Sequence, residues 1–295
     1  MNTSNLSRRE WLKLASGVGL ASFSLASGLR AMSPGIPRTQ TTPVDSAYSK
    51  RVVSLRPAGY WRLGEKHRPT AFDWSGHQHT GEYHGAPAFG EPGAIRHDSN
   101  TAIGLDGSSY VEIPNHRNFS IGAAGLTVEA WVRPDHLNFP CQANAEYIHW
   151  LGKGDAGSFE WGFRFYKKNS SRPNRISAYA WNPNGREGAG AYFEQPVTPG
   201  KWIHVVAVYQ APGKHAGVLI YRDGVLKKGP PDAPTLYSSY QVAPRHGAAP
   251  VRLGCRDLTS FLRGGLDEVA IYPRCLTADE ISKNYRLAAG AWDPL

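Results

Sequence analysis

Cysteine is scarce in this chain, with Cys141, Cys255 and Cys275 the three examples among 295 residues. An odd number at wide spacing excludes a fully paired disulfide framework, and no Cys-x-x-Cys pair indicates a zinc or redox centre. A single disulfide is compatible with this count, but we favour three small, partly buried thiols.

Long apolar runs are also missing. The strongest one, Leu14–Leu29, has 16 residues and includes three glycines, so it is too short and too weakly apolar for an ordinary transmembrane helix. It follows Ser7–Lys13 (SRREWLK), which closely resembles the twin-arginine export pattern. We therefore predict that residues 1–31 are a twin-arginine signal peptide, and that the mature protein is periplasmic or extracellular and does not span a membrane.

No dense stripe of one charge occurs in the chain. The formal charge is +9, and residues 1–31 contribute +3 of it through four basic residues and one acidic residue, which leaves +6 for the rest. An excess of this size favours anionic surroundings, such as acidic polysaccharide or cell-wall polymer, as a long-range bias. Because the basic residues are scattered and are not interleaved with aromatic ones, we predict no nucleic-acid partner.

Helical periodicity of domain-building length is absent as well. Residues 32–47 are rich in proline, threonine and serine and predict a flexible linker, residues 48–290 predict one domain, and residues 291–295 a C-terminal tail. Within the domain, strand-length segments alternate with turn residues, which predicts an all-β sandwich. The expected strands are 101–105, 110–113, 126–132, 147–151, 159–166, 175–181, 191–194, 202–209, 218–222, 225–227, 251–254 and 266–272.

Turn chemistry predicts two hairpins. Asp106-Gly107 and Asp223-Gly224 each separate two of these expected strands. Aspartate and glycine tolerate the positive φ angles of a tight primed turn, which is the usual hairpin connection.

Two distant segments predict the ends of the sandwich. Pro57–Glu65 (PAGYWRLGE) and Gly264–Tyr285 (GGLDEVAIYPRCLTADEISKNY) bracket the strand-like region, so we expect them to hold its first and last strands. In the second segment, Pro273 ends a strand, and the spacing of Thr277 and Glu280 is that of a capping box, which predicts a short helix.

Four parts of the chain carry a resemblance to a known family. They are Tyr60–Glu65 (YWRLGE), Asp73–Gly76 (DWSG), Leu105–Gly107 (LDG) leading to Leu126–Val132, and the regions 201–226 and 264–285. In this order they resemble the laminin-G-like, concanavalin A-like jelly-roll domains of bacterial secreted proteins. The resemblance implies a concanavalin A-like β-sandwich of two antiparallel sheets, but a fold does not determine a function.

The catalytic patterns of this fold are not found. Related sandwich glycosidases carry a Glu-x-Asp-x-Glu or Glu-x-Asp-x-x-Glu strand, which places an acid and a nucleophile on one face. The nearest pair here, Asp267-Glu268, points to opposite faces of a strand, and there is no Gly-x-Ser-x-Gly elbow or phosphate loop. We therefore expect a protein that is not an enzyme.

The aromatic residues divide into two groups. Trp61, Trp131 and Trp202 lie in expected strands and are expected in the core. The others lie at strand ends or in long loops. There a ring can stack on the apolar face of a sugar while polar neighbours bind the sugar hydroxyls. The alternative is that these rings only pack against the ends of the sandwich. The candidate ligand-binding residues are Tyr179, Trp181, Tyr192 and Trp150, with Asn182 and Arg186 beside them; Tyr237, Tyr240, Asn184 and Glu194 are further candidates.

Calcium is the cofactor that the resemblance implies. Asp73 and Asp267 match positions that meet in relatives to bind a structural calcium ion, whose preference for hard oxygen ligands suits two carboxylates. The alternative is that Asp73 caps a turn and Asp267 makes a hydrogen bond. In this chain the usual loop residues are replaced by His77, Gln78 and His79. A zinc site is a further alternative, because His77 and His79 alternate along the chain and His84 follows, but the spacing specifies no third ligand.

These observations predict an exported, non-catalytic, lectin-like module that binds an extracellular or cell-envelope glycan with calcium support. The alternative is a protein-interaction or envelope-structural domain with an envelope protein as partner. A polysaccharide hydrolase with an atypical active site is the second alternative. A glycan binder should present several rings on one surface, whereas a protein binder should present a broader apolar patch.

Overall fold

The computed structural model describes residues 46–290, apart from 68, 139–146, 156, 169, 183–187, 211–216 and 228–245. The described part lies in one compact unit, Thr42–Leu295. The predicted signal peptide, all but the last two residues of the linker, and the C-terminal tail lie outside the described residues, as do Cys141, Asn184, Arg186, Tyr237 and Tyr240.

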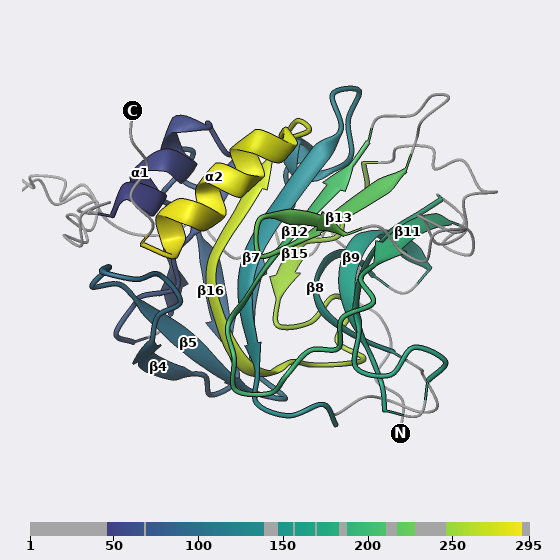
Figure 1. The fold of residues 1–295 in the computed structure, drawn as a ribbon, viewed down its shortest axis with the longest axis horizontal. Coiled ribbons are helices and arrows are strands. Elements are labelled where there is room, and N and C mark those ends of the chain that lie inside the picture. Colours follow the sequence, from purple (N-terminus) through teal and green to yellow (C-terminus); the bar gives the residue numbers. More distant parts are fainter. Residues whose placement is uncertain are drawn as a thin grey trace, which may run out of the picture. The chain divides into compact units, whose positions relative to one another are not determined.

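Two antiparallel sheets face each other, each built from eight strands (Figure 1). The first has the order β14-β13-β12-β7-β16-β5-β4, with β1 also paired to β16, and the second has the order β11-β10-β9-β8-β15-β6-β3-β2. The first sheet comprises β1 (Gly59–Trp61), β4 (Ala88–Pro92), β5 (Thr101–Asp106), β7 (Leu126–Pro134), β12 (Ile203–Tyr209), β13 (Val218–Arg222), β14 (Val225–Lys227) and β16 (Arg263–Tyr272). The second comprises β2 (Thr70–Ala71), β3 (Gly81–His84), β6 (Tyr110–Ile113), β8 (Tyr147–Asp155), β9 (Ser158–Tyr166), β10 (Ile176–Trp181), β11 (Gly188–Tyr192) and β15 (Val251–Leu253).

The main core lies between the sheets. Alternate residues of the strands point inward, so that Trp161, Phe163 and Phe165 of β9 pack with Val128 and Val205 of the first sheet in one buried cluster. The predicted concanavalin A-like sandwich is therefore confirmed. Trp61 belongs to this core as expected, whereas Trp131 is buried on the outer face of the first sheet and Trp202 is only partly buried there.

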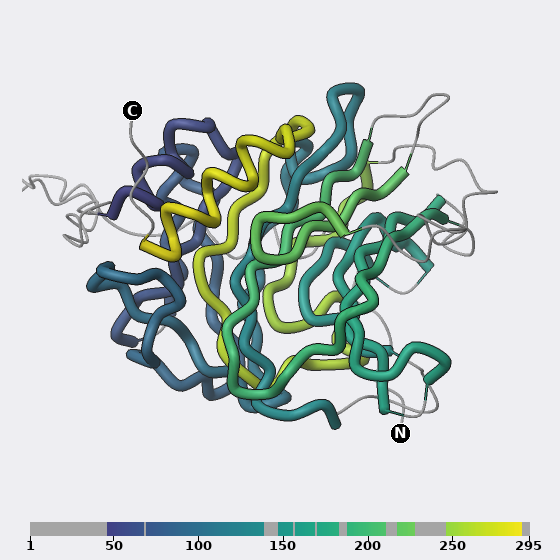
Figure 2. The backbone as a smooth tube through the Cα atoms, viewed as in Figure 1, coloured from purple at the N-terminus to yellow at the C-terminus, as the bar shows by residue number. Residues whose placement is uncertain are grey.

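The expected pairing of the chain's first and last strands is confirmed. Strand β1 pairs with β16, with Gly59 opposite Ile271 and Trp61 opposite Val269. Figure 2 shows the yellow β16 running between strands from earlier in the chain, and its neighbours are β7, β5 and β1. An ion pair between Arg62 and Glu268 joins the two segments further.

One predicted hairpin is confirmed and the other is wrong. Strands β13 and β14 pair across Asp223-Gly224, both of which have positive φ angles. In contrast, β5 pairs within the first sheet and β6 within the second, so Asp106-Gly107 links the two sheets. There Asp106 accepts hydrogen bonds from the amides of Ser108 and Ser109, and this local turn carries no information about which strands will pair.

Two helices cover the outer face of the first sheet. The C-terminal α2 (Ala278–Ala288) begins with the predicted capping box of Thr277 and Glu280, which is confirmed. The helix α1 (Ala47–Ser54) was not predicted; it begins at the end of the expected linker, where Ser46 caps it. Figure 1 shows α1 and α2 beside β16, and Val52 of α1 and Ile281 of α2 share an apolar cluster with strand residues. A short 3-10 helix, η2, spans Arg117–Phe119.

A buried carboxylate ties these helices to the sheet. Glu129 of β7 accepts hydrogen bonds from Tyr48 of α1, Tyr272 of β16 and Asn284 of α2, at 3.0–3.1 Å for the helix residues and 2.8 Å for Tyr272. His204 Nε2 of β12 lies 2.8 Å from the same carboxylate. Burial alone would raise the pKa of Glu129, but the hydrogen bonds and the charge of His204 outweigh it and bring the pKa below its ordinary value of 4.5.

The cysteines with described positions form no disulfide with each other. Cys255 is buried, which raises its pKa to about 12, and Cys275 is partly buried with its Sγ 3.7 Å from the carbonyl of Tyr209. Both agree with the favoured interpretation of partly buried thiols.

We predict that Glu129→Ala lowers the free energy of unfolding by about 3–5 kcal/mol, because it leaves several buried polar groups without their acceptor. Chemical denaturation at neutral pH measures this change, with the exposed Glu82→Ala as control. Because the pKa of Glu129 is lowered on folding, its contribution is complete above the ordinary pKa and is lost as the pH falls through the folded one. Equal loss in both variants would contradict this role.

Candidate functional site

Aromatic side chains gather on the outer face of the second sheet, over strands β8–β11. Tyr179 and Trp181 are two residues apart in β10 and so point to the same side. Their ring centroids lie 4.7 Å apart. Tyr192 of β11 pairs with Ser177, so it belongs to the same outward series. In β9, the outward series is Glu160, Gly162, Arg164 and Tyr166, and in β8 it includes Tyr147, His149 and Gly152.

Glycines form a floor beneath these rings. Gly188 and Gly190 of β11 lie opposite Trp181 and Tyr179. A Cβ atom at Gly190 would come within 2.5 Å of the Tyr179 ring, and one at Gly188 within 2.7 Å, so both must be glycine for the ring to lie flat on the strand. The packing of the Tyr179 ring therefore explains why every second residue in Gly188-Ala-Gly190-Ala is glycine.

A second pair of glycines makes room for an arginine. Gly152 and Gly162 lie opposite each other in β8 and β9, and the stem of Arg256 crosses them, 2.9 Å from the position of a Cβ at Gly152. The guanidinium carbon of Arg256 lies 4.5 Å from the Trp181 ring centroid and 3.7 Å from that of Phe159. These are stacking distances, so Arg256 and the two rings form one packed unit.

Polar partners hold this arginine in place. Arg256 Nη2 donates to Asp257 at 2.6 Å, and Nη1 donates to His149 Nε2 at 2.8 Å. Burial lowers the pKa of His149 well below its ordinary value, and the nearby charges of Arg256 and Arg164 lower it further. His149 is therefore neutral and serves as an acceptor for Arg256.

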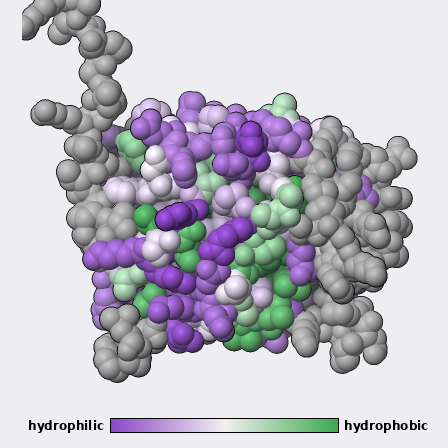
Figure 3. Space-filling model, turned by 90° about the horizontal axis from the view of Figure 1, so that it is seen from above, coloured by the Kyte–Doolittle hydropathy of each residue, from purple (hydrophilic) through white to green (hydrophobic). Residues whose placement is uncertain are grey.

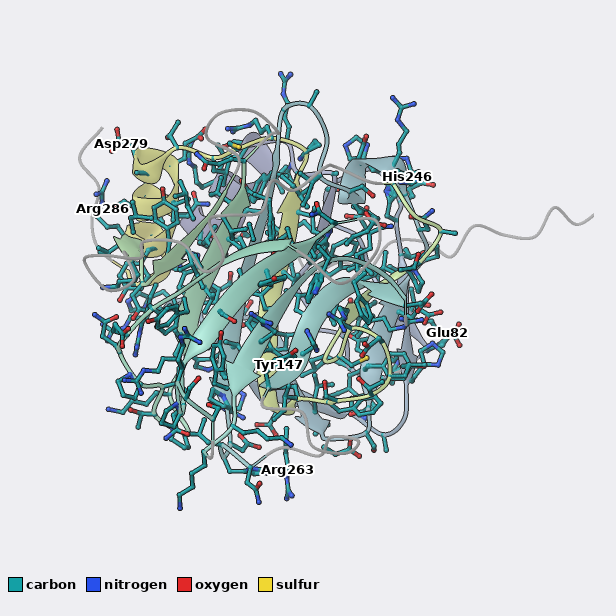
Figure 4. All side chains as sticks on the ribbon, turned by 90° about the vertical axis from the view of Figure 1, so that its right-hand side faces the viewer. Glu82, Tyr147, His246, Arg263, Asp279 and Arg286 are labelled. Carbon is teal, nitrogen blue, oxygen red and sulfur yellow. The ribbon has the colours of Figure 1, made fainter. Side chains whose placement is uncertain are left out.

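Arg164 is the second cation of this face. Its guanidinium carbon lies 4.4 Å from the ring centroid of Tyr179, 4.6 Å from that of Tyr147 and 5.7 Å from that of Tyr166. Its Nε donates to Ser177 Oγ at 3.1 Å. Figure 4 shows Tyr147 near the middle of this side of the molecule, over the strands of the second sheet.

Three of the predicted ligand-binding residues come together here. Tyr179, Trp181 and Tyr192 lie on this one face, although the fractions of their surface that are exposed, 7%, 8% and 5%, are smaller than an open platform would have. Asn182 follows Trp181 and is partly buried, and Arg186 lies outside the described residues. Whether these residues bind a ligand stays a prediction.

The placement of Trp150 on the binding surface was wrong. Its side chain is 0% exposed and packs against Phe163 and Phe165 in the core. The register of β8 and β9 shifts between His149 and Leu151, and the inserted residue lets Trp150 and its neighbour Leu151 both point into the core.

The sequence analysis did not predict the two arginines of this face, Arg164 and Arg256. Arg164 lies inside β9, where the outward positions are a mixture of serine, glutamate, glycine, arginine and tyrosine, so the local sequence does not show that Arg164 meets the rings of neighbouring strands. Arg256 comes from the segment after β15, and no local pattern connects it to Trp181.

The two predicted calcium ligands have other partners in the structure. Asp73 Oδ1 accepts from the amides of Tyr60 and Ser75, and Oδ2 accepts from the amide of His79, at 2.8–2.9 Å. Asp267 Oδ2 accepts from the amide of Ala94 at 2.8 Å. An ion would have to displace such donors from Asp73. Within the described residues, no three His, Cys, Asp or Glu side chains cluster as a metal site. Calcium binding stays a prediction.

The carboxylates near this face are already paired. Glu160 contacts Lys153 in an ion pair and accepts from the amide of Gly247, while Asp257 binds Arg256. Glu194 accepts from the hydroxyl of Tyr192 at 2.5 Å. In the described part of this face, we therefore find no pair of free carboxyl groups of the kind that glycosidic cleavage needs.

None of the described helices is long and apolar enough to cross a membrane.

Known structures share this fold at low sequence identity. Domain 4 of AbnA, an extracellular arabinanase from Geobacillus stearothermophilus solved in complex with arabinotriose, is 16% identical with a TM-score of 0.56, over 79% of this chain and 98% of that one. The receptor-binding domain of botulinum neurotoxin type G is 16% identical with a TM-score of 0.53, over 79% of this chain and 51% of that one. The binding domain of Paraclostridial Mosquitocidal Protein 1 is 12% identical with a TM-score of 0.57, over 79% and 52%.

A search of curated protein sequences finds no match to this chain. A family model does match it: residues 105–282 fit the model described as the concanavalin A-like lectin/glucanases superfamily. This segment covers more than half of the chain and contains most strands of both sheets. The chain therefore belongs to the concanavalin A-like lectin/glucanase superfamily.

Proposed function

We propose that this protein is an exported, non-catalytic carbohydrate-binding module, and that it holds a glycan on the outer face of strands β8–β11. The observation that carries the proposal is the Tyr179–Trp181 pair, with its ring centroids 4.7 Å apart beside the glycine floor of β11. Sugars present an apolar C–H face that stacks on aromatic rings, and their hydroxyls bind planar hydrogen-bonding groups. Arg256 and His149 supply such groups directly beside Trp181.

The comparisons support a binding module in general terms. The AbnA domain was solved in complex with arabinotriose, and two other similar structures are the receptor-binding domain of a botulinum neurotoxin and the binding domain of a mosquitocidal protein. At 12–16% identity these similarities extend to the fold alone, so the site proposed here rests on the residues of this chain.

The two alternatives have less support in the described residues. A protein-docking face needs a continuous apolar patch, and hydrophobic residues do gather in one area of the face in Figure 3, among hydrophilic ones. However, Val225 and Leu258 are the only large apolar side chains that are exposed in the described part of the chain. A hydrolase would need free carboxyl groups, and two carboxylates described near the aromatic face, Glu160 and Asp257, are paired.

Replacing Trp181 tests the proposed surface. We expect Trp181→Ala to weaken polysaccharide binding about tenfold, or ~1–2 kcal/mol, because one stacking face is lost. Affinity electrophoresis in gels containing arabinan, xylan, alginate or polygalacturonate measures the change. Trp202→Ala is the matched control, because Trp202 also stacks with an arginine, Arg133, but on the first sheet. Equal weakening in both variants, or no retardation of the wild-type protein in any gel, would overturn the proposal.

Calcium support has a separate test. If Asp73 and Asp267 bind the ion in the folded protein only, calcium at about 100 times its dissociation constant raises the free energy of unfolding by ~2.7 kcal/mol. Thermal unfolding after chelation and after calcium addition measures this gain, and Asp267→Asn should abolish it while the exposed Asp279→Asn keeps it. A melting curve that does not respond to calcium would show that the loop is held by its hydrogen bonds alone.

Export is tested in the cell of origin. We expect replacement of Arg8 and Arg9 by lysine to leave a full-length precursor in the cytoplasm, because the twin-arginine route requires the arginine pair. Fractionation and immunoblotting measure the distribution, and Arg30→Lys is the control within the same leader. Normal export of the double variant would show that another route is used.

A further inference from the structure

Arg164 is a buried cation without a counter-ion. Only 5% of its surface is exposed, and in the described part of the chain no carboxylate lies within ion-pairing distance of it. One of its guanidinium nitrogens, Nη2, is buried without any hydrogen-bond partner. A hydrogen-bond donor on a buried cation that lacks an acceptor costs free energy.

The other buried arginine and lysine side chains in the described part of the chain each have a counter-ion. Lys153 pairs with Glu160, Arg62 with Glu268 and Asp98, and Arg256 with Asp257. Arg164 has three tyrosine rings instead, at 4.4–5.7 Å, which attract a cation but neutralise no charge. An uncompensated buried charge is costly, and such groups occur preferentially at functional sites.

The position of Arg164 connects it to the proposed glycan surface. Tyr179 stacks with Arg164 on one side and lies 4.7 Å from the Trp181 ring centroid on the other. Beyond Tyr166, Arg172 stacks on Tyr166 and Tyr192, at 5.8 and 5.0 Å. Three guanidinium groups, those of Arg256, Arg164 and Arg172, therefore follow one another among the rings of this face. Tyr147 covers Arg164 and is itself partly exposed.

We propose that the glycan recognised on this face is acidic, and that a sugar carboxylate accepts the hydrogen bonds that Arg164 leaves unmade. A guanidinium group presents donors in a planar fork that matches a carboxylate, and a uronate places such a group on the edge of a ring that can stack on Tyr179 or Trp181. The inference rests on the proposed function, because it names the class of sugar for the same surface. The net charge of +6 outside residues 1–31 acts in the same direction over a longer range.

The decisive comparison removes the charge from the ligand and keeps the sugar. Alginate, polygalacturonate and hyaluronan are each titrated into the wild-type protein by isothermal titration calorimetry, beside the carboxyl-reduced form of the same polymer. We expect at least one acidic polymer to bind about tenfold more tightly than its reduced counterpart, which corresponds to one good charge-assisted contact. Raising the salt concentration should weaken the binding of the acidic form more than that of the reduced form.

Variants then assign the contact to Arg164. Arg164→Gln should bind the acidic polymer about tenfold more weakly and the reduced polymer unchanged, while Arg164→Lys, which keeps the charge, should bind better than Arg164→Gln. Arg222→Gln is the matched control, because Arg222 of β13 stacks on Phe193, whose ring lies in the core between the sheets and not on the outer face. If Arg164→Gln does not fold, the wild-type comparison and Arg164→Lys still decide the question.

The outcomes separate the two proposals. If reduced and acidic polymers bind equally, or only neutral polymers bind, the acidic ligand is wrong and the glycan surface stands, provided that Trp181→Ala weakens the binding. If the acidic polymers bind but Arg164→Gln and Arg222→Gln lose affinity equally, the assignment to Arg164 is wrong. If no polymer binds in either form, both proposals fail.

Discussion

A charge that leaves water must find an opposite charge or a full set of hydrogen bonds, and this constraint organises the described part of the molecule. Glu129 meets it by drawing hydrogen bonds from two helices and from strand β16, which fixes α1 and α2 on the first sheet. Arg62 meets it through Asp98 and Glu268, which fastens the first strand of the domain to the last. The helices and the closing strand are thus held by these polar contacts together with an apolar cluster on the outer face of the first sheet, while the main core holds the two sheets together.

The opposite sheet shows what happens when the constraint is met only in part. Its outer face carries Arg256, compensated by Asp257, and Arg164, which has tyrosine rings around it and no acidic partner among the described residues. A purely structural face of a sandwich gains nothing from a cation of this kind. The two outer faces therefore differ in charge compensation: the buried carboxylate of Glu129 meets hydrogen-bond donors from the chain's own helices, whereas Arg164 on the second sheet has no acid beside it among the described residues.

The sequence predicted correctly those structural features that depend on contacts between residues close together in the chain. The capping box at Thr277, the Asp223-Gly224 hairpin and the strand expected at residues 159–166 follow from rules that act over a few residues, and they were predicted correctly. Asp106-Gly107 has the same turn chemistry as a hairpin, yet its strands separate into different sheets, because pairing depends on distant partners. Trp150 was misplaced for a related reason: a register shift in β8 lets Trp150 and Leu151 both point inward, and nothing in the residues themselves reveals the shift.

The same distinction applies to the candidate site. Tyr179 and Trp181 share a face because they are two apart in one strand, which can be read from the sequence, whereas Arg256 reaches them from a segment about 75 positions away.

The glycine floor has a consequence for how such a surface can change. The height at which the Tyr179 ring lies is set by the absence of side chains at Gly188 and Gly190, since any Cβ there would occupy the space of the ring. A single added methyl group would therefore tilt or lift the ring while every ligand-facing residue stayed the same. The shape of this face therefore depends partly on the glycines beneath the ring. Related sequences with identical aromatic and basic residues can still present differently shaped surfaces if these glycines differ.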